Sequence, residues 1–353
     1  MKNINTETLH NYIISVDSTF KDALEKLNKL SNELTLFVID NQNHLIGTIT
    51  DGDIRRVIIS GVNLEENISN GLNRNCKKIY VDNIDHHLLK KYAQEKIFLI
   101  PIVDEQQTLK GYLNLNEVKT ILPLDVIFMA GGKGERLKPL TLKTPKPMLP
   151  LNGKPILDHN ITRLIQFGID NVTISVNYLK ENIKKYFGHE FFKGIKIDYV
   201  EEDIPLGTLG SICLKNDFEN DDLLVMNSDI LTNINLEEVF DFYKRSQADM
   251  TIATIGYNVN VPYAVIETTN HIVTALKEKP SYTYQSNAGI YIFKKKYLQY
   301  IPIGIKYDTT DLIEKLISEG KKVVNFEILD YWLDIGRHED YEKAQQDIRF
   351  LKL

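Results

Sequence analysis

Residues 126–150 read VIFMAGGKGERLKPLTLKTPKPMLP. The apolar run Val126–Ala130 leads directly into the glycine-rich segment Gly131–Gly134, a pattern typical of a buried strand followed by a tight loop. Glycines allow backbone N–H groups to close on a phosphate, because no side chain stands in the way. A glycine cluster after a strand is also common in ordinary turns, and this one fits neither the Walker pattern nor the dinucleotide GxGxxG. The loop alone therefore does not define a function.

The charges around the loop make it more specific. Lys133, Arg136 and Lys146 lie within fourteen residues of one another, and three prolines restrict the backbone beside them: Pro139, Pro145 and Pro147. Three cations held around a triphosphate would neutralise the charge that develops on the α-phosphate and on departing pyrophosphate. A run of charges is more often a solvated surface, but solvated lysines are rarely braced by prolines.

The complete pattern GGxGxRLxPLTxxxPKPMLP resembles the signature of the sugar-1-phosphate nucleotidyltransferases, and the resemblance extends over Leu124–Leu353. It implies an α/β domain with a doubly wound, mostly parallel, Rossmann-like sheet. Apolar strands such as 172–176, alternating with predicted helices at 155–168 and 309–319, favour the same architecture. In such a domain Arg136 and Lys146 are the expected catalytic cations, and the nucleotide would be bound by Ala130, Gly131, Gly132, Lys133 and Gly134.

Two aspartates are candidate metal ligands. Asp229 ends the apolar stretch Val225–Asp229, where open α/β sheets place their ligands, and Asp334 lies in Tyr331–Gly336. The resemblance implies that both bind Mg²⁺, which proteins commonly hold with two carboxylates and substrate phosphates. By residue pattern alone, each aspartate is equally well explained as a helix cap at a strand end.

Further motifs resemble the walls of the family's sugar pocket. The implied sugar-phosphate ligands are Glu278 and Lys279 in an EKP motif, Asn287 and Gly289 in SNAGIY, Ala264 in PYAV, and Asn177. Simpler interpretations remain open, since Glu278 and Lys279 could form a surface pair and Asn287 and Gly289 a turn.

The base of the nucleotide is indicated by Glu202, five residues before Gly207 in EEDIPLGTLG. Family members that use uridine or thymidine nucleotides commonly have Gln there. A carboxylate instead suits guanine, whose N1–H and exocyclic amine are two adjacent donors. Glu202, Gly207 and Thr208 are thus predicted to bind GTP, although Glu201 and Glu202 could also be an exposed acidic turn.

The first 120 residues contain a repeat with an offset of 64 positions, in which Phe37–Ile49 matches Pro101–Leu113. Each copy predicts two strands around a tight turn, and with a helix signal capped by Thr19 the unit is helix, strand, strand, helix, made twice. The pattern resembles a pair of CBS domains, regulatory modules that often hold a nucleotide. Thr50 and Asp53 match that family's ligand motif, whereas the second copy has Asn114 and Glu117. Structural packing without a ligand is the alternative.

Length and composition indicate the domain organisation and exclude several classes of protein. The predicted domains are a tandem CBS domain over 1–122, with repeats at about 7–62 and 70–122, and a transferase domain over 124–353. A net charge of −6 indicates no general attraction to nucleic acid or to acidic membranes. Cys76 and Cys213 are too few for a disulfide framework or a zinc site. Without a signal-peptide-like or membrane-spanning stretch, a cytoplasmic location is expected.

The combination of both domains resembles the glucosamine-1-phosphate guanylyltransferases of bacterial legionaminic acid biosynthesis, which implies GTP and glucosamine 1-phosphate as substrates and Mg²⁺ as cofactor. A uridylyltransferase, or a guanylyltransferase for mannose or heptose 1-phosphate, is the alternative within the class. A non-catalytic sensor of sugar nucleotides is the alternative from another class. Because CBS pairs often associate, a homodimer is expected, with a possible regulatory nucleotide at the CBS pair.

Overall fold

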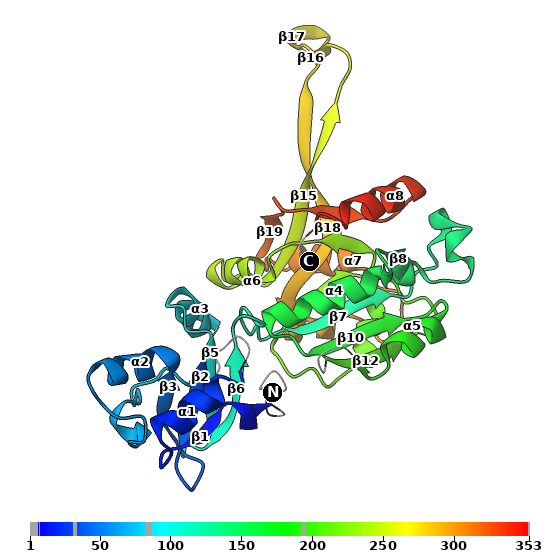
Figure 1. Ribbon diagram of the computed structural model, residues 1–353. Coiled ribbons are helices and arrows are strands. Elements are labelled where there is room, and N and C mark those ends of the chain that lie inside the picture. The colour runs from blue at the N-terminus through cyan, green and yellow to red at the C-terminus, as the bar shows by residue number, and fades with distance from the viewer. Residues whose placement is uncertain are drawn as a thin grey trace. The chain divides into compact units, whose positions relative to one another are not determined.

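The computed structural model describes residues 6, 8–30, 34–81, 86–191, 195–202 and 204–351. The chain divides into two compact units (Figure 1). The first comprises Met1–Leu122 together with Ile165–Asp170, and the second comprises Pro123–Leu164 together with Asn171–Leu353.

The first unit contains two three-stranded sheets. One is built from β1 (Ile13–Ser15), β2 (Thr35–Ile39) and β3 (Leu45–Thr50), with α1 (Phe20–Leu27) and α2 (Asp51–Ile59). The other is built from β4 (Ile79–Tyr80), β5 (Leu99–Val103) and β6 (Leu109–Asn114), with α3 (His86–Gln94). Thr19 caps α1 as predicted, since its side chain accepts from the Asp22 amide.

The two sheets are joined by a symmetric pair of backbone hydrogen bonds. The amide of Leu45 donates to the carbonyl of Gln107 at 2.9 Å, and the amide of Leu109 donates to the carbonyl of Asn43 at 2.9 Å. These two bonds are related by the same 64-residue offset as the sequence repeat. Apolar residues of both copies share one core: Phe37, Ile39, Leu45, Leu99, Val103, Leu109 and Tyr112. The two copies therefore fold as one unit.

The predicted closing helix of the second copy is wrong. After β6 the chain makes a turn over 115–117 and no helix follows before the second unit begins at Pro123. The side chain of Asn114 accepts from the amide of Asn116 at 3.0 Å, a local bond that competes with helix formation. In the first copy, by contrast, Thr50 caps a full helix, α2.

The second unit is built on an eight-stranded sheet with the strand order β11-β12-β10-β7-β13-β18-β15-β19. Strands β12, β10, β7 and β13 run parallel to their neighbours in turn, β15 and β19 are parallel, and the β18 pairings are antiparallel. The bounds are β7 (Asp125–Ala130), β10 (Asn171–Val176), β11 (Glu190–Phe191), β12 (Ile195–Glu201), β13 (Asp222–Asn227), β15 (Met250–Asn260), β18 (Ser281–Lys294) and β19 (Val323–Glu327). The sheet is mostly parallel, as predicted.

Helices connect these strands: α4 (Ile156–Leu164), α5 (Lys180–Phe187), α6 (Leu236–Arg245), α7 (Thr309–Ser318) and α8 (His338–Asp347). The predicted helix at 155–168 is thus α4, continued by a 3-10 turn over Ile165–Phe167, and the predicted helix at 309–319 is α7. Short strands of the same unit also pair, β8 (Pro150–Leu151) with β9 (Lys154–Pro155) and β14 (Ile230–Thr232) with β20 (Trp332–Asp334).

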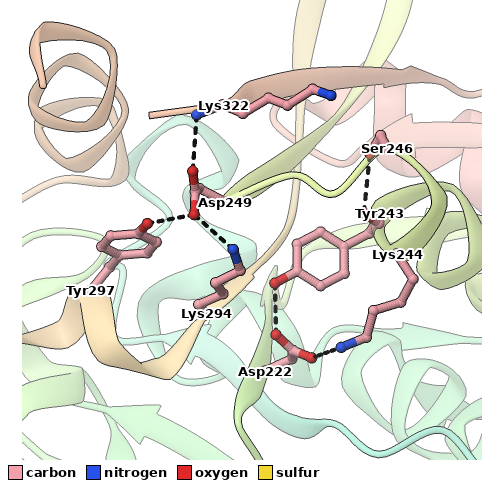
Figure 2. A network of polar contacts seen from close by, with 8 residues as sticks. All are labelled: Asp222, Tyr243, Lys244, Ser246, Asp249, Lys294, Tyr297 and Lys322. Atoms are coloured by element: carbon pink, nitrogen blue, oxygen red, sulfur yellow. Dashed lines mark hydrogen bonds and ion pairs between the residues drawn. The ribbon is translucent and has the colours of Figure 1, made fainter. Parts of the chain in front are cut away.

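Two neighbouring carboxylates hold the end of the sheet where β13 and β15 begin (Figure 2). Asp222 accepts from the Tyr243 hydroxyl at 2.6 Å and from Lys244 Nζ at 2.5 Å. Asp249 accepts from three groups: Lys294 Nζ at 2.8 Å, the Tyr297 hydroxyl at 2.5 Å and the Lys322 amide at 3.0 Å. The Asp222 bonds tie α6 to β13, and the Asp249 bonds tie the start of β15 to β18 and to the start of β19.

A two-stranded ribbon extends from the sheet of the second unit (Figure 1). Beyond Thr254 and Asn287, β15 and β18 have no strand partner but each other among the described strands. The segment between them forms the hairpin β16 (Val265–Thr269) and β17 (Ile272–Lys277). We call residues 256–286 the arm. Among the helices that the structure describes, none is long and apolar enough to cross a membrane.

Candidate active site

The glycine-rich loop that follows β7 folds back on the lysine predicted to be catalytic. Gly134 has a φ of +62°, and a Cβ at this position would lie 2.9 Å from Thr141 Cγ2 and 3.1 Å from Lys146 Cβ. The Thr141 hydroxyl also donates to the Gly134 carbonyl at 2.9 Å. Only glycine combines this backbone conformation with so close an approach, so the glycine sets the loop against Lys146.

Asp229 and Asp334 lie together, although they are far apart in the sequence. In the β14–β20 pairing Ile230 is opposite Asp334, and the Ile335 amide donates to the Asp229 carbonyl at 3.1 Å. Lys146 Nζ donates to the Asp229 carboxylate and lies 3.7 Å from Asp334 Oδ1. The two predicted metal ligands and one predicted catalytic cation therefore form a single cluster.

One apolar cluster fixes the segments that carry these charges. Leu137, Leu231 and Ile335 are fully buried in it, next or nearly next to Arg136, Asp229 and Asp334 in the sequence. It also contains Leu149, Leu151, Ile156, Ala344 and Ile348. Because close-packed side chains rarely shift, this packing holds the charged residues in a set position.

The pair of aspartates includes one unsatisfied carboxylate oxygen. Asp229 Oδ1 is buried and has no hydrogen-bond partner among the described residues. Burial raises the pKa of Asp334, the neighbouring Asp229 raises it further, and Lys146 and Arg136 act in the opposite direction. An unsatisfied buried oxygen beside a second carboxylate fits a divalent ion that takes its other ligands from phosphate and water. Within the described ranges there is no cluster of three or more His, Cys, Asp or Glu residues able to hold a metal.

A pocket of about 290 Å³ lies beside this cluster. Of the predicted nucleotide ligands, Gly131, Gly132, Glu202, Gly207 and Thr208 line it, whereas Ala130, Lys133 and Gly134 do not. Its lining consists of Met129, Gly131, Gly132, Glu202, Pro205, Gly207, Thr208, Asn227, Asp229 and Asp308. The pocket thus joins the glycine-rich loop, the EEDIPLGTLG segment and one metal-ligand candidate.

Glu202 is held in the pocket wall by two hydrogen bonds. Oε1 accepts from the Ser175 hydroxyl at 2.9 Å, and Oε2 accepts from the Leu206 amide at 2.9 Å. A carboxylate offers about four lone-pair sites, so each oxygen can accept one more donor. Glu202 is 7% exposed, which makes the exposed-turn interpretation wrong for it. Glu201 is exposed and paired with Lys180 and Lys184, but it is the last residue of β12 and not part of a turn.

The same wall contains a residue that the sequence analysis missed. Asp308 Oδ1 accepts from the Thr208 amide at 2.8 Å, and the Tyr307 carbonyl accepts from the amides of Leu209 and Gly210, each at 3.0 Å. These bonds fasten the loop around Gly207 to the start of α7. Asp308 with Asp311 forms the capping box of that helix, and an Asp directly before a predicted helix was the available signal.

Some predicted sugar ligands lie near the pocket and others do not. Asn177 Nδ2 donates to the Glu202 carbonyl at 3.0 Å, and Gly289 lies against Asn227, which lines the pocket. Asn287 makes a local turn, since its Oδ1 accepts from the Gly289 amide at 2.9 Å. Ala264, Glu278 and Lys279 lie on the arm, where all three are exposed and none lines the pocket.

In the first unit, the two predicted ligand residues have different surroundings. Thr50 borders a pocket of about 370 Å³ that is lined by both repeats, whereas Asp53 is not part of its lining. The Asp53 carboxylate accepts from the Thr50 amide at 2.9 Å and the Thr50 hydroxyl at 2.7 Å, and it also pairs with Arg56. Asp53 thus caps α2 in this structure.

The second unit thus combines a mostly parallel sheet, a glycine-rich loop and a cation flanked by two carboxylates. The sequence profile of the nucleotidyl transferase family matches residues 125–349, and the chain belongs to that family. The profile of the CBS domain matches residues 7–60, within the first unit.

The chain is similar to sugar-1-phosphate guanylyltransferases. It is 32% identical over 231 residues to the mannose-1-phosphate guanylyltransferase of Mycobacterium tuberculosis, covering 64% of each chain. It is 33% identical over 231 residues to the D-glycero-alpha-D-manno-heptose 1-phosphate guanylyltransferase of Aneurinibacillus thermoaerophilus, covering 64% of this chain and 99% of that one. The chain thus spans less than two thirds of the length of the mycobacterial relative.

A solved structure is similar in fold to the second unit. It is that of HddC from Yersinia pseudotuberculosis complexed with GMP-PN, which is 26% identical with a TM-score of 0.50. The match covers 64% of this chain and 99% of that chain.

Proposed function

We propose that this protein transfers a nucleoside monophosphate from a nucleoside triphosphate to a sugar 1-phosphate and releases pyrophosphate. The observation that carries the proposal is the cluster of Asp229, Lys146 and Asp334 beside a pocket that contains the glycine-rich loop. Family membership and similarity to guanylyltransferases support it.

Asp229 and Asp334 would hold Mg²⁺ in this reaction. When bound, the ion would supply positive charge to the α-phosphate and the departing pyrophosphate. Lys146 would then release the carboxylates and pair with a phosphate instead, and Arg136 and Lys133 would bind the remaining phosphate oxygens. The attacking oxygen of a sugar 1-phosphate is already anionic, so the side chains position groups and neutralise charge rather than remove a proton.

GTP is the proposed donor. The carboxylate of Glu202 faces the pocket with lone pairs left on both oxygens, which suits the two adjacent N–H donors of guanine. A uridine base would present one donor flanked by two acceptors, and a carboxylate would repel the acceptors. A uridylyltransferase is therefore the less favoured alternative.

Glucosamine 1-phosphate is the proposed acceptor. Support comes from the resemblance of the whole chain, a CBS pair followed by a transferase domain, to the enzymes that provide GDP-glucosamine for legionaminic acid, a surface nonulosonic acid. Mannose 1-phosphate and heptose 1-phosphate are the acceptors named for the two relatives above, so they are the first alternatives to test.

Pyrophosphate release measures this function directly. The full chain with Mg²⁺ would be incubated with each of four nucleoside triphosphates in combination with glucosamine, mannose, glucose and heptose 1-phosphates. We expect release with GTP and one sugar 1-phosphate, and none when either substrate is omitted. Release with UTP alone among the triphosphates would favour the uridylyltransferase. Binding of a sugar nucleotide without any release would favour the sensor.

A second binding function is proposed for the first unit, namely a regulatory nucleotide in the pocket beside Thr50. Both repeats line this pocket, and Lys77 and Lys96 provide cations there for phosphates. Calorimetric titration with adenosine and guanosine nucleotides would test it. Thr50→Val should abolish binding, whereas Thr19→Val, which removes the equivalent capping box from α1, should not. Equal binding by both variants would contradict this proposal.

A further inference from the structure

The arm has one apolar face and one polar face. In its register Tyr257 is opposite Tyr284, and Val259 is opposite Tyr282. Because side chains alternate across a strand, these four lie on the same face. Tyr257 is 61% exposed and Tyr284 59% exposed. The other face carries Gly256, Asn258, Asn260, Ser281, Thr283 and Gln285. This alternation is typical of a ribbon that is covered on one side, yet Tyr257, Val259 and Tyr284 on the apolar face are exposed.

The end of the arm is equally apolar. Ile266 and Leu276 are opposite each other in the β16–β17 hairpin, and they are 57% and 63% exposed. Ile272 and Val273 are 70% and 62% exposed. Among the described strands, β16 and β17 pair only with each other. An isolated two-stranded hairpin is marginally stable in water, and an apolar surface of this extent marks an interaction site.

The arm cannot reach the pocket of its own chain while its strands stay paired. The β15–β18 register is continuous from Thr254–Asn287 to Asn260–Ser281 and leads away from the eight-stranded sheet (Figure 1). Glu278 and Lys279 lie beyond this paired segment and are exposed. Bringing them to Asp229 within one chain would break the backbone bonds that form the arm.

The surroundings of the pocket offer a complementary surface. Ile204, next to the pocket residue Pro205, is 60% exposed. Ile303 and Ile305, on the segment that leads to the pocket residue Asp308, are 77% and 59% exposed. One chain thus presents an apolar arm and an apolar pocket rim that do not cover each other.

We propose that two copies of this chain exchange arms, so that each arm packs on the pocket rim of the other copy and brings Glu278 and Lys279 to its sugar phosphate. The proposal rests on the proposed function, because it assigns the missing part of the same site to a second copy. In a twofold-symmetric dimer the exchange is reciprocal, so both arms are covered at the same time. Lys279 then supplies a cation to the sugar phosphate in the partner's pocket.

Complementation between two inactive variants tests the exchange. Asp229→Asn keeps the arm but loses a metal ligand, and Lys279→Ala keeps the metal ligands but loses the arm cation. Full-length chains of the two variants would be coexpressed with different tags, and the mixed dimer would be isolated through both tags. In an exchanged dimer, one of its two sites combines the intact arm of one chain with the intact pocket of the other.

The mixed dimer is expected to recover about half of the wild-type activity per dimer, while each parent variant falls by at least about 100-fold. A mixed dimer as inactive as its parents would overturn the exchange and leave the proposed reaction standing. Full activity of Lys279→Ala would also overturn it, because the arm would then supply nothing to the site.

A second measurement does not depend on activity. A photoreactive benzoylphenylalanine would replace Val273, and a mixture of ¹⁴N- and ¹⁵N-labelled protein would be refolded together, irradiated and digested. We expect crosslinks between differently labelled chains, joining the arm to peptides that contain Ile204 or Ile303–Ile305. Crosslinks within one chain only, or none, would contradict the exchange even if the reaction itself were never detected.

Discussion

Asp229 directly precedes Ile230, which is opposite Asp334 in a two-stranded sheet, and both carboxylates approach the ammonium of Lys146. A lysine between two carboxylates balances charge when no other cation is bound. One buried oxygen of Asp229 nevertheless stays without a hydrogen bond among the described residues. We therefore expect this pair of carboxylates to accept a divalent cation.

Replacing Asp334 by Asn should separate activity from stability. We expect turnover to fall by about 100-fold or more, because a proposed metal ligand is lost. The melting temperature should not fall, because the pKa of Asp334 is raised by burial and by Asp229, so its charge is unfavourable in the metal-free protein. Steady-state rates and thermal unfolding without Mg²⁺ measure both effects. Asp217→Asn, a carboxylate 82% exposed and paired with Lys215, is the control and should retain full activity.

Replacing Glu202 by Gln should change the preferred base. An amide cannot accept both guanine donors, so kcat/KM for GTP should fall by about 10- to 100-fold. The kcat/KM for UTP should rise relative to that for GTP. The matched control is Glu201→Gln, since Glu201 is exposed and pairs with Lys180 at 2.6 Å and with Lys184 at 2.6 Å. Equal changes in the two variants would indicate that Glu202 does not contact the base.

Gly207 should not tolerate a methyl group. Its φ is +79°, and a Cβ would lie 2.6 Å from Asp308 Oδ1 and 2.7 Å from the Tyr307 carbonyl oxygen. Gly207→Ala is therefore expected to displace the loop and to raise KM for the triphosphate by about 10-fold or more. Gly320→Ala separates steric collision from backbone strain, because Gly320 has a φ of +67° with nothing within 4 Å of a Cβ. That control should lose about 1 kcal/mol of stability and leave KM unchanged.

The contribution of Asp249 to stability should depend on pH. Burial alone would raise the pKa of Asp249, but bonds from Lys294, Tyr297 and the Lys322 amide outweigh it and hold the pKa well below its ordinary value of 3.8. A carboxyl group whose pKa is lowered by folding stabilises the protein at pH values above the pKa that the group has in the unfolded chain. This contribution is lost progressively as the pH falls below about 4.

Asp249→Asn should therefore reduce the free energy of unfolding by about 1.5–3 kcal/mol near neutral pH, and the difference from wild type should shrink below about pH 4. Denaturant titrations at several pH values measure it. Tyr297→Phe removes one neutral donor and keeps the carboxylate, so its smaller loss should persist over a wider pH range. A constant difference for Asp249→Asn down to pH 2 would be inconsistent with this explanation.

Local sequence signals predicted the elements whose causes are local. The 64-residue repeat was visible because paired strands and tight turns recur with fixed spacing, and the reciprocal bonds of Leu45 and Leu109 follow that spacing. The helix after β6 was predicted by analogy with the first copy. It is absent because the side chain of Asn114 bonds locally to the amide of Asn116, whereas Thr50 caps a helix.

Contacts between segments that are distant in the sequence were harder to predict. The proximity of Asp229 and Asp334 was expected only through the family resemblance, since it depends on the β14–β20 pairing, which no local pattern predicts. The role of Asp308 in holding the loop around Gly207 was missed because a helix cap explains an aspartate at that position equally well. The exposed positions of Glu278 and Lys279 depend on the extended register of β15 and β18, and sequence order alone does not determine where such a ribbon packs.

The most direct test of the central claim is ³¹P NMR of the full chain with Mg²⁺, GTP and glucosamine 1-phosphate, compared with Asp229→Asn under the same conditions. With wild-type protein, the signals of the sugar phosphate and of the triphosphate should decline together, while the signals of a nucleoside diphosphate sugar and of pyrophosphate appear. Asp229→Asn should show neither product. If the wild-type spectrum stayed unchanged with every triphosphate and sugar 1-phosphate tested, although the folded protein bound GTP, nucleotidyl transfer at this site would be contradicted.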